Sequence, residues 1–113
     1  MNNALYVFGT PEKPTNDLER QFWEFHAENP HVYVLFHRFT MEAALTGRER
    51  FAVSPVIERI RWYTSVETRG DEFKINNNFR AYYARLWMRN NPEYDGLFST
   101  RTLTAKKTEG ELT

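Results

Sequence analysis

The chain contains no cysteine, and this absence removes several kinds of chemistry. Without a thiol the chain can form no disulfide, no thiolate nucleophile and no iron–sulfur cluster, and a zinc site could use no sulfur ligand. An excess of one charge is also missing, because 15 Lys and Arg balance 15 Asp and Glu. A chain without cysteine suits a reducing compartment, so we expect it in the cytoplasm.

Long hydrophobic runs are missing as well. No apolar stretch approaches the roughly 20 residues that a membrane-spanning helix needs. The N-terminus lacks the basic region and apolar stretch of a secretory signal. We therefore expect a soluble protein that has no membrane partner.

Aromatic residues are the feature in excess. Nine Phe, six Tyr and three Trp make up 16% of the 113 residues, which is too aromatic for a chain that is disordered throughout. The length suits one domain with one core. We predict a single globular domain over residues 1–103, followed by a polar, flexible tail over 104–113.

The balanced charge hides a division along the chain. Residues 1–47 carry three basic and six acidic groups, whereas residues 48–113 carry twelve basic and nine acidic groups. Nine of those twelve basic residues are arginine, whose planar guanidinium binds phosphates and carboxylates with two parallel hydrogen bonds. Any binding surface for an anionic partner is therefore expected in the second part.

Apolar side chains recur at spacings of three and four residues in four segments, which predicts four helices. Thr15 or Asn16 caps the first helix, and Gly47 ends the second. Ser54 caps the third helix, and Glu58 completes a capping box. The residues that carry the four patterns are Leu18, Phe22 and Phe25; Val32, Leu35, Phe36, Phe39 and Ala43; Val56, Ile57 and Ile60; and Phe79, Tyr82, Tyr83 and Leu86.

The spacing changes after the third helix. Residues 62–66 and 73–76 alternate between apolar and polar side chains, which predicts two strands joined by a turn at Arg69-Gly70-Asp71. Asn76, Asn77 and Asn78 then supply a cap for the fourth helix. The expected fold class is therefore α+β, mainly helical, with about four helices and one β-hairpin.

This order of elements resembles the winged helix-turn-helix family over about residues 30–76. The resemblance implies that the third helix enters the major groove of DNA and that the hairpin acts as the wing. The runs Ile60-Arg61-Trp62, Phe73-Lys74-Ile75 and Tyr82-Tyr83-Ala84 also resemble small phage and prophage proteins. A regulator that acts in the cytoplasm of a bacterial host cell is what this second resemblance implies.

Basic and amide side chains around the third helix and the hairpin form the first candidate site. Arginine and asparagine read guanine and adenine edges, and both also bind phosphate. The leading hypothesis is therefore a DNA-binding protein that is not an enzyme and needs no cofactor or metal. The residues assigned to DNA are Arg48, Arg50, Arg59, Arg61, Arg69, Lys74 and Asn76.

The aromatic surplus supports an alternative, a protein-binding module that modulates or inhibits a host protein. Trp, Tyr and Arg dominate the residues that contribute most energy to protein interfaces. A dense aromatic core explains the same surplus equally well. Association of two copies of the chain into a homodimer is a further alternative. The residues assigned to an interface are Trp62, Tyr63, Arg85, Trp87 and Arg89.

A third reading is a metal-dependent nuclease. Glu72 and Lys74 lie two apart on one predicted strand and match half of such a site, with Glu58 or Glu67 as the second carboxylate. The pattern Glu-x-Lys is common by chance, so this reading ranks last.

Overall fold

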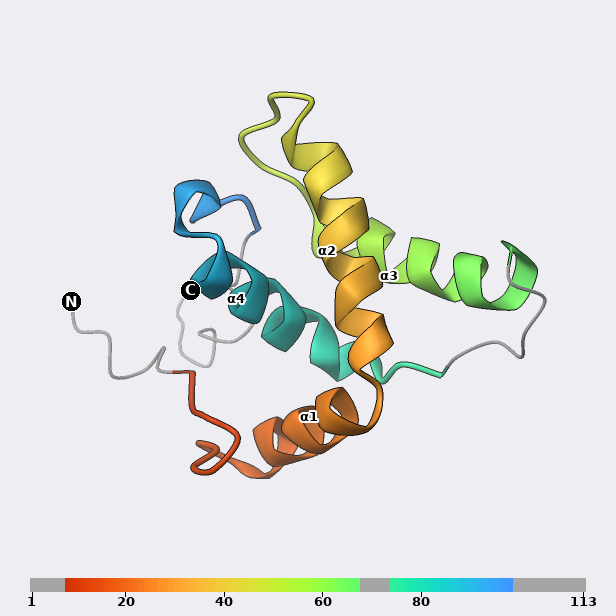
Figure 1. The fold of residues 1–113 in the computed structure, drawn as a ribbon. Coiled ribbons are helices and arrows are strands. Elements are labelled where there is room, and N and C mark those ends of the chain that lie inside the picture. The colour runs from red at the N-terminus through yellow and green to blue at the C-terminus, as the bar shows by residue number, and fades with distance from the viewer. Residues whose placement is uncertain (1–7, 68–73, 99–113) are drawn as a thin grey trace, which may run out of the picture.

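A computed structural model describes residues 8–67 and 74–98, and all regular structure in these two ranges is helical (Figure 1). None of the described helices is long and apolar enough to cross a bilayer. In chain order the elements are α1 (Asp17–Glu28), α2 (Pro30–Ala44), α3 (Val53–Trp62), a π-helical turn (Tyr63–Glu67), a 3₁₀ turn (Asn77–Phe79), α4 (Arg80–Asn90) and a second 3₁₀ turn (Pro92–Tyr94).

The predicted β-hairpin and wing are wrong, since the described residues contain no strand. Residues 63–67 instead continue α3 as a π-helical turn, and residues 74–76 are an irregular connection. The alternation after Ile60 also fits a helix, because Tyr63 and Thr64 follow it at i+3 and i+4 and are partly buried. The Ile75 carbonyl accepts a hydrogen bond from the Arg61 side chain at 2.8 Å. The predicted tip at residue 69 lies outside the described ranges.

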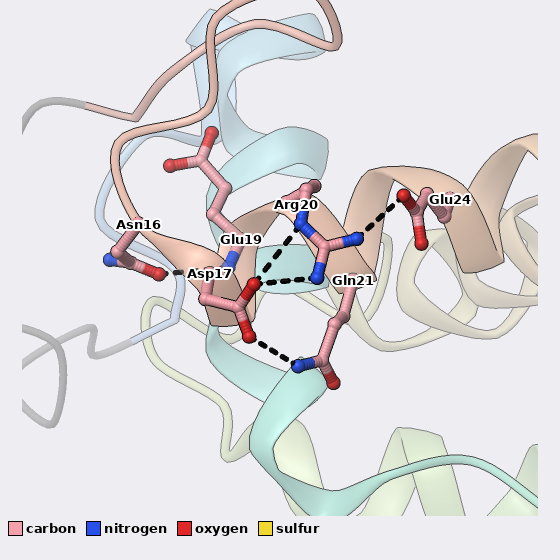
Figure 2. A network of polar contacts seen from close by, with 6 residues as sticks. All are labelled: Asn16, Asp17, Glu19, Arg20, Gln21 and Glu24. Carbon is pink, nitrogen blue, oxygen red and sulfur yellow. Dashed lines mark hydrogen bonds and ion pairs between the residues drawn. The ribbon is translucent and has the colours of Figure 1, made fainter.

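The first helix begins where the sequence predicts. The Asn16 side chain accepts a hydrogen bond from the Glu19 backbone N–H at 2.8 Å, so it caps α1 (Figure 2). Arg20 lies between Asp17 and Glu24 on the exposed side of the helix and forms ion pairs with both, at 2.5 and 2.7 Å. Hydrogen bonds from Arg20 hold the pKa of Asp17 below its usual value.

The ends of α2 and α3 agree only in part with the predicted caps. Pro30 opens α2, and Gly47 follows its end with a positive φ of 91° that favours glycine. The predicted cap at Ser54 is wrong, because α3 already starts at Val53 and its cap residue is Ala52, two residues before Ser54. Ser54 instead accepts a hydrogen bond from Arg80 at 2.8 Å, which links α3 to the start of α4.

Aromatic side chains make up much of the core between the helices. Tyr83 of α4 is fully buried, with its ring edge-on to Phe22 of α1 at 4.8 Å and stacked on Phe36 of α2 at 5.5 Å. Aromatic pairs in these geometries add to the stabilisation from burial alone. Most of the aromatic residues in the described ranges are therefore buried in this core or packed against it.

The C-terminal part of the described chain closes this core. Leu97 and Phe98 are buried, and the Leu97 carbonyl accepts a hydrogen bond from the Phe51 N–H at 2.8 Å. This bond ties the connector between α2 and α3 to the segment after α4. The tail predicted over 104–113 lies outside the described residues.

Candidate functional site

The two arginines predicted to enter the DNA groove are both engaged within the protein. Arg59 forms an ion pair with Glu42 of α2 at 2.6 Å, and its guanidinium lies 4.0 Å from the centre of the Phe39 ring. Arg61 binds Glu58 and the Asn77 side chain, each at 2.6 Å, and its side chain is only 17% exposed. Arg61 is therefore a link between α3 and the connection to α4.

The other predicted DNA contacts are spread over different environments. Arg48, Arg50 and Lys74 are exposed and form no ion pair within the described residues. Asn76 uses its side-chain oxygen to accept from the Asn78 N–H at 2.8 Å, which caps the turn before α4. Arg69 lies outside the described residues.

A pocket of about 310 Å³ opens between the C-terminal half of α2, the connector and the first turns of α3. In Figure 1 the connector loops from the end of α2 back to the start of α3. Aromatic and aliphatic side chains form most of the lining of the pocket, together with three charged side chains and one threonine. The lining residues are Phe39, Glu42, Ala43, Thr46, Arg48, Phe51, Pro55, Val56 and Arg59.

The charges at this pocket sum to +1, from two guanidiniums and one carboxylate. Glu42 is paired with Arg59, whereas Arg48 lies 5.2 Å from the centre of the Phe51 ring with no carboxylate partner among the described residues. The face of an aromatic ring attracts a cation, so Phe51 helps to hold Arg48 beside the pocket. Arg48 is thus the cation that remains available to an incoming group.

Trp62 extends this surface along α3. Pro55, Arg59 and Trp62 lie at i, i+4 and i+7, so they share one face of the helix. Trp62 is 59% exposed, which is unusual for so large an apolar side chain. Tyr63, the next predicted interface residue, is partly buried and packs edge-on against Phe39 at 5.9 Å. We call Trp62 together with the residues lining the pocket the α2–α3 surface.

The remaining predicted interface residues do not lie on the α2–α3 surface. Trp87 is fully buried and donates a hydrogen bond to Nδ1 of His37 at 2.9 Å, so it presents nothing to a partner in this fold. Arg85 and Arg89 line a separate pocket with Phe8. The predicted interface set is therefore divided among two surfaces and the core.

Sequence reasoning missed the contribution of α2 and of Phe51. The sequence indicated Phe39 only as part of an apolar helix face and Glu42 only as one of the six acidic groups of residues 1–47, although both lie against Arg59 of α3. Their pairing joins residues on different helices, so no local pattern signals it. Phe51 carries a weak signal, since it is an aromatic residue directly after Arg48 and Arg50 in the connector.

No metal centre is found within the described residues, where no three His, Asp or Glu side chains form a suitable cluster. Glu58, one predicted nuclease carboxylate, is paired with Arg61, and Glu72 lies outside the described ranges. Burial lowers the pKa of His26 and raises the pKa of Tyr83 far above its usual value. His26 is partly buried and stacks on the ring of Phe22, so it lies against the aromatic core.

Comparison of the chain with protein-family models, curated protein sequences and solved structures finds no match.

Proposed function

We propose that this chain is a non-enzymatic protein-binding module of the cytoplasm, which acts through the α2–α3 surface on another protein. The observation that supports it most is the engagement of Arg59 and Arg61 by carboxylates of the chain itself. A surface that binds DNA gains affinity from cations free to neutralise phosphates, and these two are already neutralised. An apolar pocket beside an exposed tryptophan suits a protein partner better.

The charge of the pocket indicates the kind of partner segment. An apolar side chain can fill the space over Phe39, Phe51 and Val56, where it would be removed from water. A carboxylate next to it can pair with Arg48, which has no carboxylate partner in the described ranges. The occupant is therefore an acidic segment of a protein with one large apolar residue.

The test is capture of a partner by the immobilised full-length chain from a nuclease-treated lysate of the cells that encode it. The wild type should retain one protein at a fixed stoichiometry. Arg48→Glu and Trp62→Ala should each weaken retention by about tenfold or more, because both remove exposed contacts of the α2–α3 surface. Circular dichroism verifies that both variants remain folded.

Lys13→Glu is the matched control, since it reverses one exposed charge in the segment before α1 and leaves the α2–α3 surface intact. It should retain the partner as the wild type does. Retention of no protein at a fixed stoichiometry, or equal retention by all variants, would contradict the proposal.

DNA binding is the second candidate, and the exposure of Arg48, Arg50 and Lys74 supports it. If DNA is the partner, the logarithm of the affinity for labelled duplex should fall linearly with the logarithm of the salt concentration. Fluorescence polarisation with duplex and single-stranded DNA measures this. Absence of binding to both at low salt would dismiss the candidate.

A further inference from the structure

Helix α4 carries three arginines and no acidic residue. Arg80 uses its donors on the Asn77 carbonyl and on Ser54, so it is engaged at the start of the helix. Arg85 and Arg89 lie one turn apart and share a face. Both guanidiniums lie 5.7 Å from the centre of the ring of Phe8, which comes from the segment before α1.

Neither of these two arginines forms an ion pair within the described part of the chain. Arg89 donates to the Gly9 carbonyl at 3.3 Å, and the buried Nε of Arg85 has no hydrogen-bond partner. Like charges at this spacing repel each other, and a buried donor without an acceptor costs free energy. The ring of Phe8 compensates for part of this cost, since its face attracts cations.

Phe8 is held firmly enough to act as a fixed wall. Its ring packs against the rings of Phe22, Trp23 and Tyr82, with centroid distances of 6.1, 5.2 and 5.7 Å. Burial lowers the pKa of Arg85, whereas the charge of Glu19 raises it; Glu19 is not within ion-pairing distance. The two cations are thus positioned without an ion-pair partner among the described residues.

A pocket of about 470 Å³ lies at this place, lined by Phe8, Arg85, Met88, Arg89 and Asp95. Its formal charge is +1, from two arginines and one aspartate. Asp95 lines the pocket but forms no ion pair with either arginine. Met88 and Phe8 supply apolar walls beside the guanidiniums.

We infer that this Arg85–Arg89 pocket binds an oxyanion group, a carboxylate or a phosphate, carried by a small molecule with an apolar body. The two guanidiniums offer several N–H donors to the oxygens, and such charge-assisted bonds are stronger than neutral ones. The apolar body packs against Met88 and Phe8. This pocket shares no residue with the α2–α3 surface, so it does not depend on the function proposed there.

The experiment is a titration of the protein with small-molecule probes. Calorimetry measures the heat of binding, and NMR measures the shifts of the amide resonances of α4. Benzoate and phenyl phosphate are the two anionic probes, and benzyl alcohol is the neutral one. Both anions should bind and shift the resonances around Arg85 and Arg89, whereas benzyl alcohol should not. The anion that binds with the higher affinity identifies the group as carboxylate or phosphate.

Variants then locate the site. Arg89→Gln removes an exposed guanidinium, and Arg85→Lys keeps the charge but loses the planar donors. Each should weaken binding by about tenfold. Arg38→Gln is the matched control, because Arg38 is also exposed and also stacks on aromatic rings, those of Phe39 and Tyr63. It should bind as the wild type does.

Binding of neither anion at millimolar concentration overturns the inference. Equal affinity of the wild type and Arg89→Gln also overturns it, as does an equal loss in Arg38→Gln. Partner capture through the α2–α3 surface is measured separately, so failure of one proposal leaves the other standing.

Discussion

At the scale of single residues, the least expected feature is the burial of Glu19. Its side chain is fully buried, and three hydrogen bonds from neighbouring donors satisfy its carboxylate. Oε1 accepts from the backbone N–H and the hydroxyl of Thr15, and Oε2 accepts from the Trp23 indole at 2.8 Å. Gly9 is required beside it, since a Cβ there would lie 2.6 Å from Oε2 and 2.6 Å from the backbone carbonyl oxygen of Lys13. The sequence indicated only an acidic residue in the first turn of a helix.

Glu19→Gln should lower the free energy of unfolding by about 1–3 kcal/mol. The amide replaces one accepting oxygen with a donor, which then faces either Thr15 or the Trp23 indole and leaves buried groups unpaired. Urea unfolding followed by circular dichroism measures the change. Glu24→Gln on the same helix is the control, and its cost should stay below about 0.5 kcal/mol because that carboxylate is largely exposed. Equal losses in the two variants would show that Glu19 is not buried in this way.

At the scale of secondary structure, the spacing of apolar residues predicted the positions of the helices. It did not predict the start of α3 or the helical turn that follows α3. The cap of α3 was misplaced because Ser54-Pro55 is a common start signal, yet Ser54 is drawn into a hydrogen bond with Arg80. The strands were misassigned because a short segment that alternates in polarity also fits one more helical turn. Arg61, near the end of α3, donates hydrogen bonds to the Asn77 side chain and to the Ile75 carbonyl, and these bonds tie this end of α3 to the chain before α4.

Ala52→Ser should raise the free energy of unfolding by about 0.5–1 kcal/mol. Ala52 has the extended backbone of a cap residue, φ −79° and ψ 142°, but makes no side-chain bond to the helix. A serine hydroxyl there can accept from the Ser54 N–H, although not from Pro55, which has none. Thermal unfolding measures the gain.

Ala27→Ser is the control for this substitution, because Ala27 lies exposed inside α1, where serine is a weaker helix former than alanine. Ala27→Ser should leave the free energy of unfolding unchanged or lower it slightly. A loss of stability in Ala52→Ser would contradict the assigned start of α3.

At the scale of the whole molecule, the three tryptophans differ in exposure to solvent, and this difference shows which parts of the fold are core and which are surface. Trp23 and Trp87 are 7% and 0% exposed, whereas Trp62 is 59% exposed near the end of α3. In Figure 1 this end of α3 projects to one side, away from the other helices. Trp62 is therefore the one tryptophan that solvent or a partner reaches.

Acrylamide quenching of tryptophan fluorescence tests this division. The native protein should show a readily quenched component, and Trp62→Phe should abolish it. Trp23→Phe, which removes a buried indole, should retain it. A quenched component that persists in Trp62→Phe would contradict the placement of α3 and its following turn.

The sequence by itself determined the four helices, a cap for the first helix at Thr15 or Asn16, and the division between an acidic and an arginine-rich part. These features depend on neighbours three or four residues apart, so local spacing suffices to find them. Tertiary structure alone decided which arginines remain available. Arg59 meets Glu42 seventeen residues away, Trp87 meets His37 fifty residues away, and Arg89 meets Gly9 eighty residues away. Contacts over such separations arise only when the helices pack, and that packing decides which cations form ion pairs with carboxylates of the described chain and which do not.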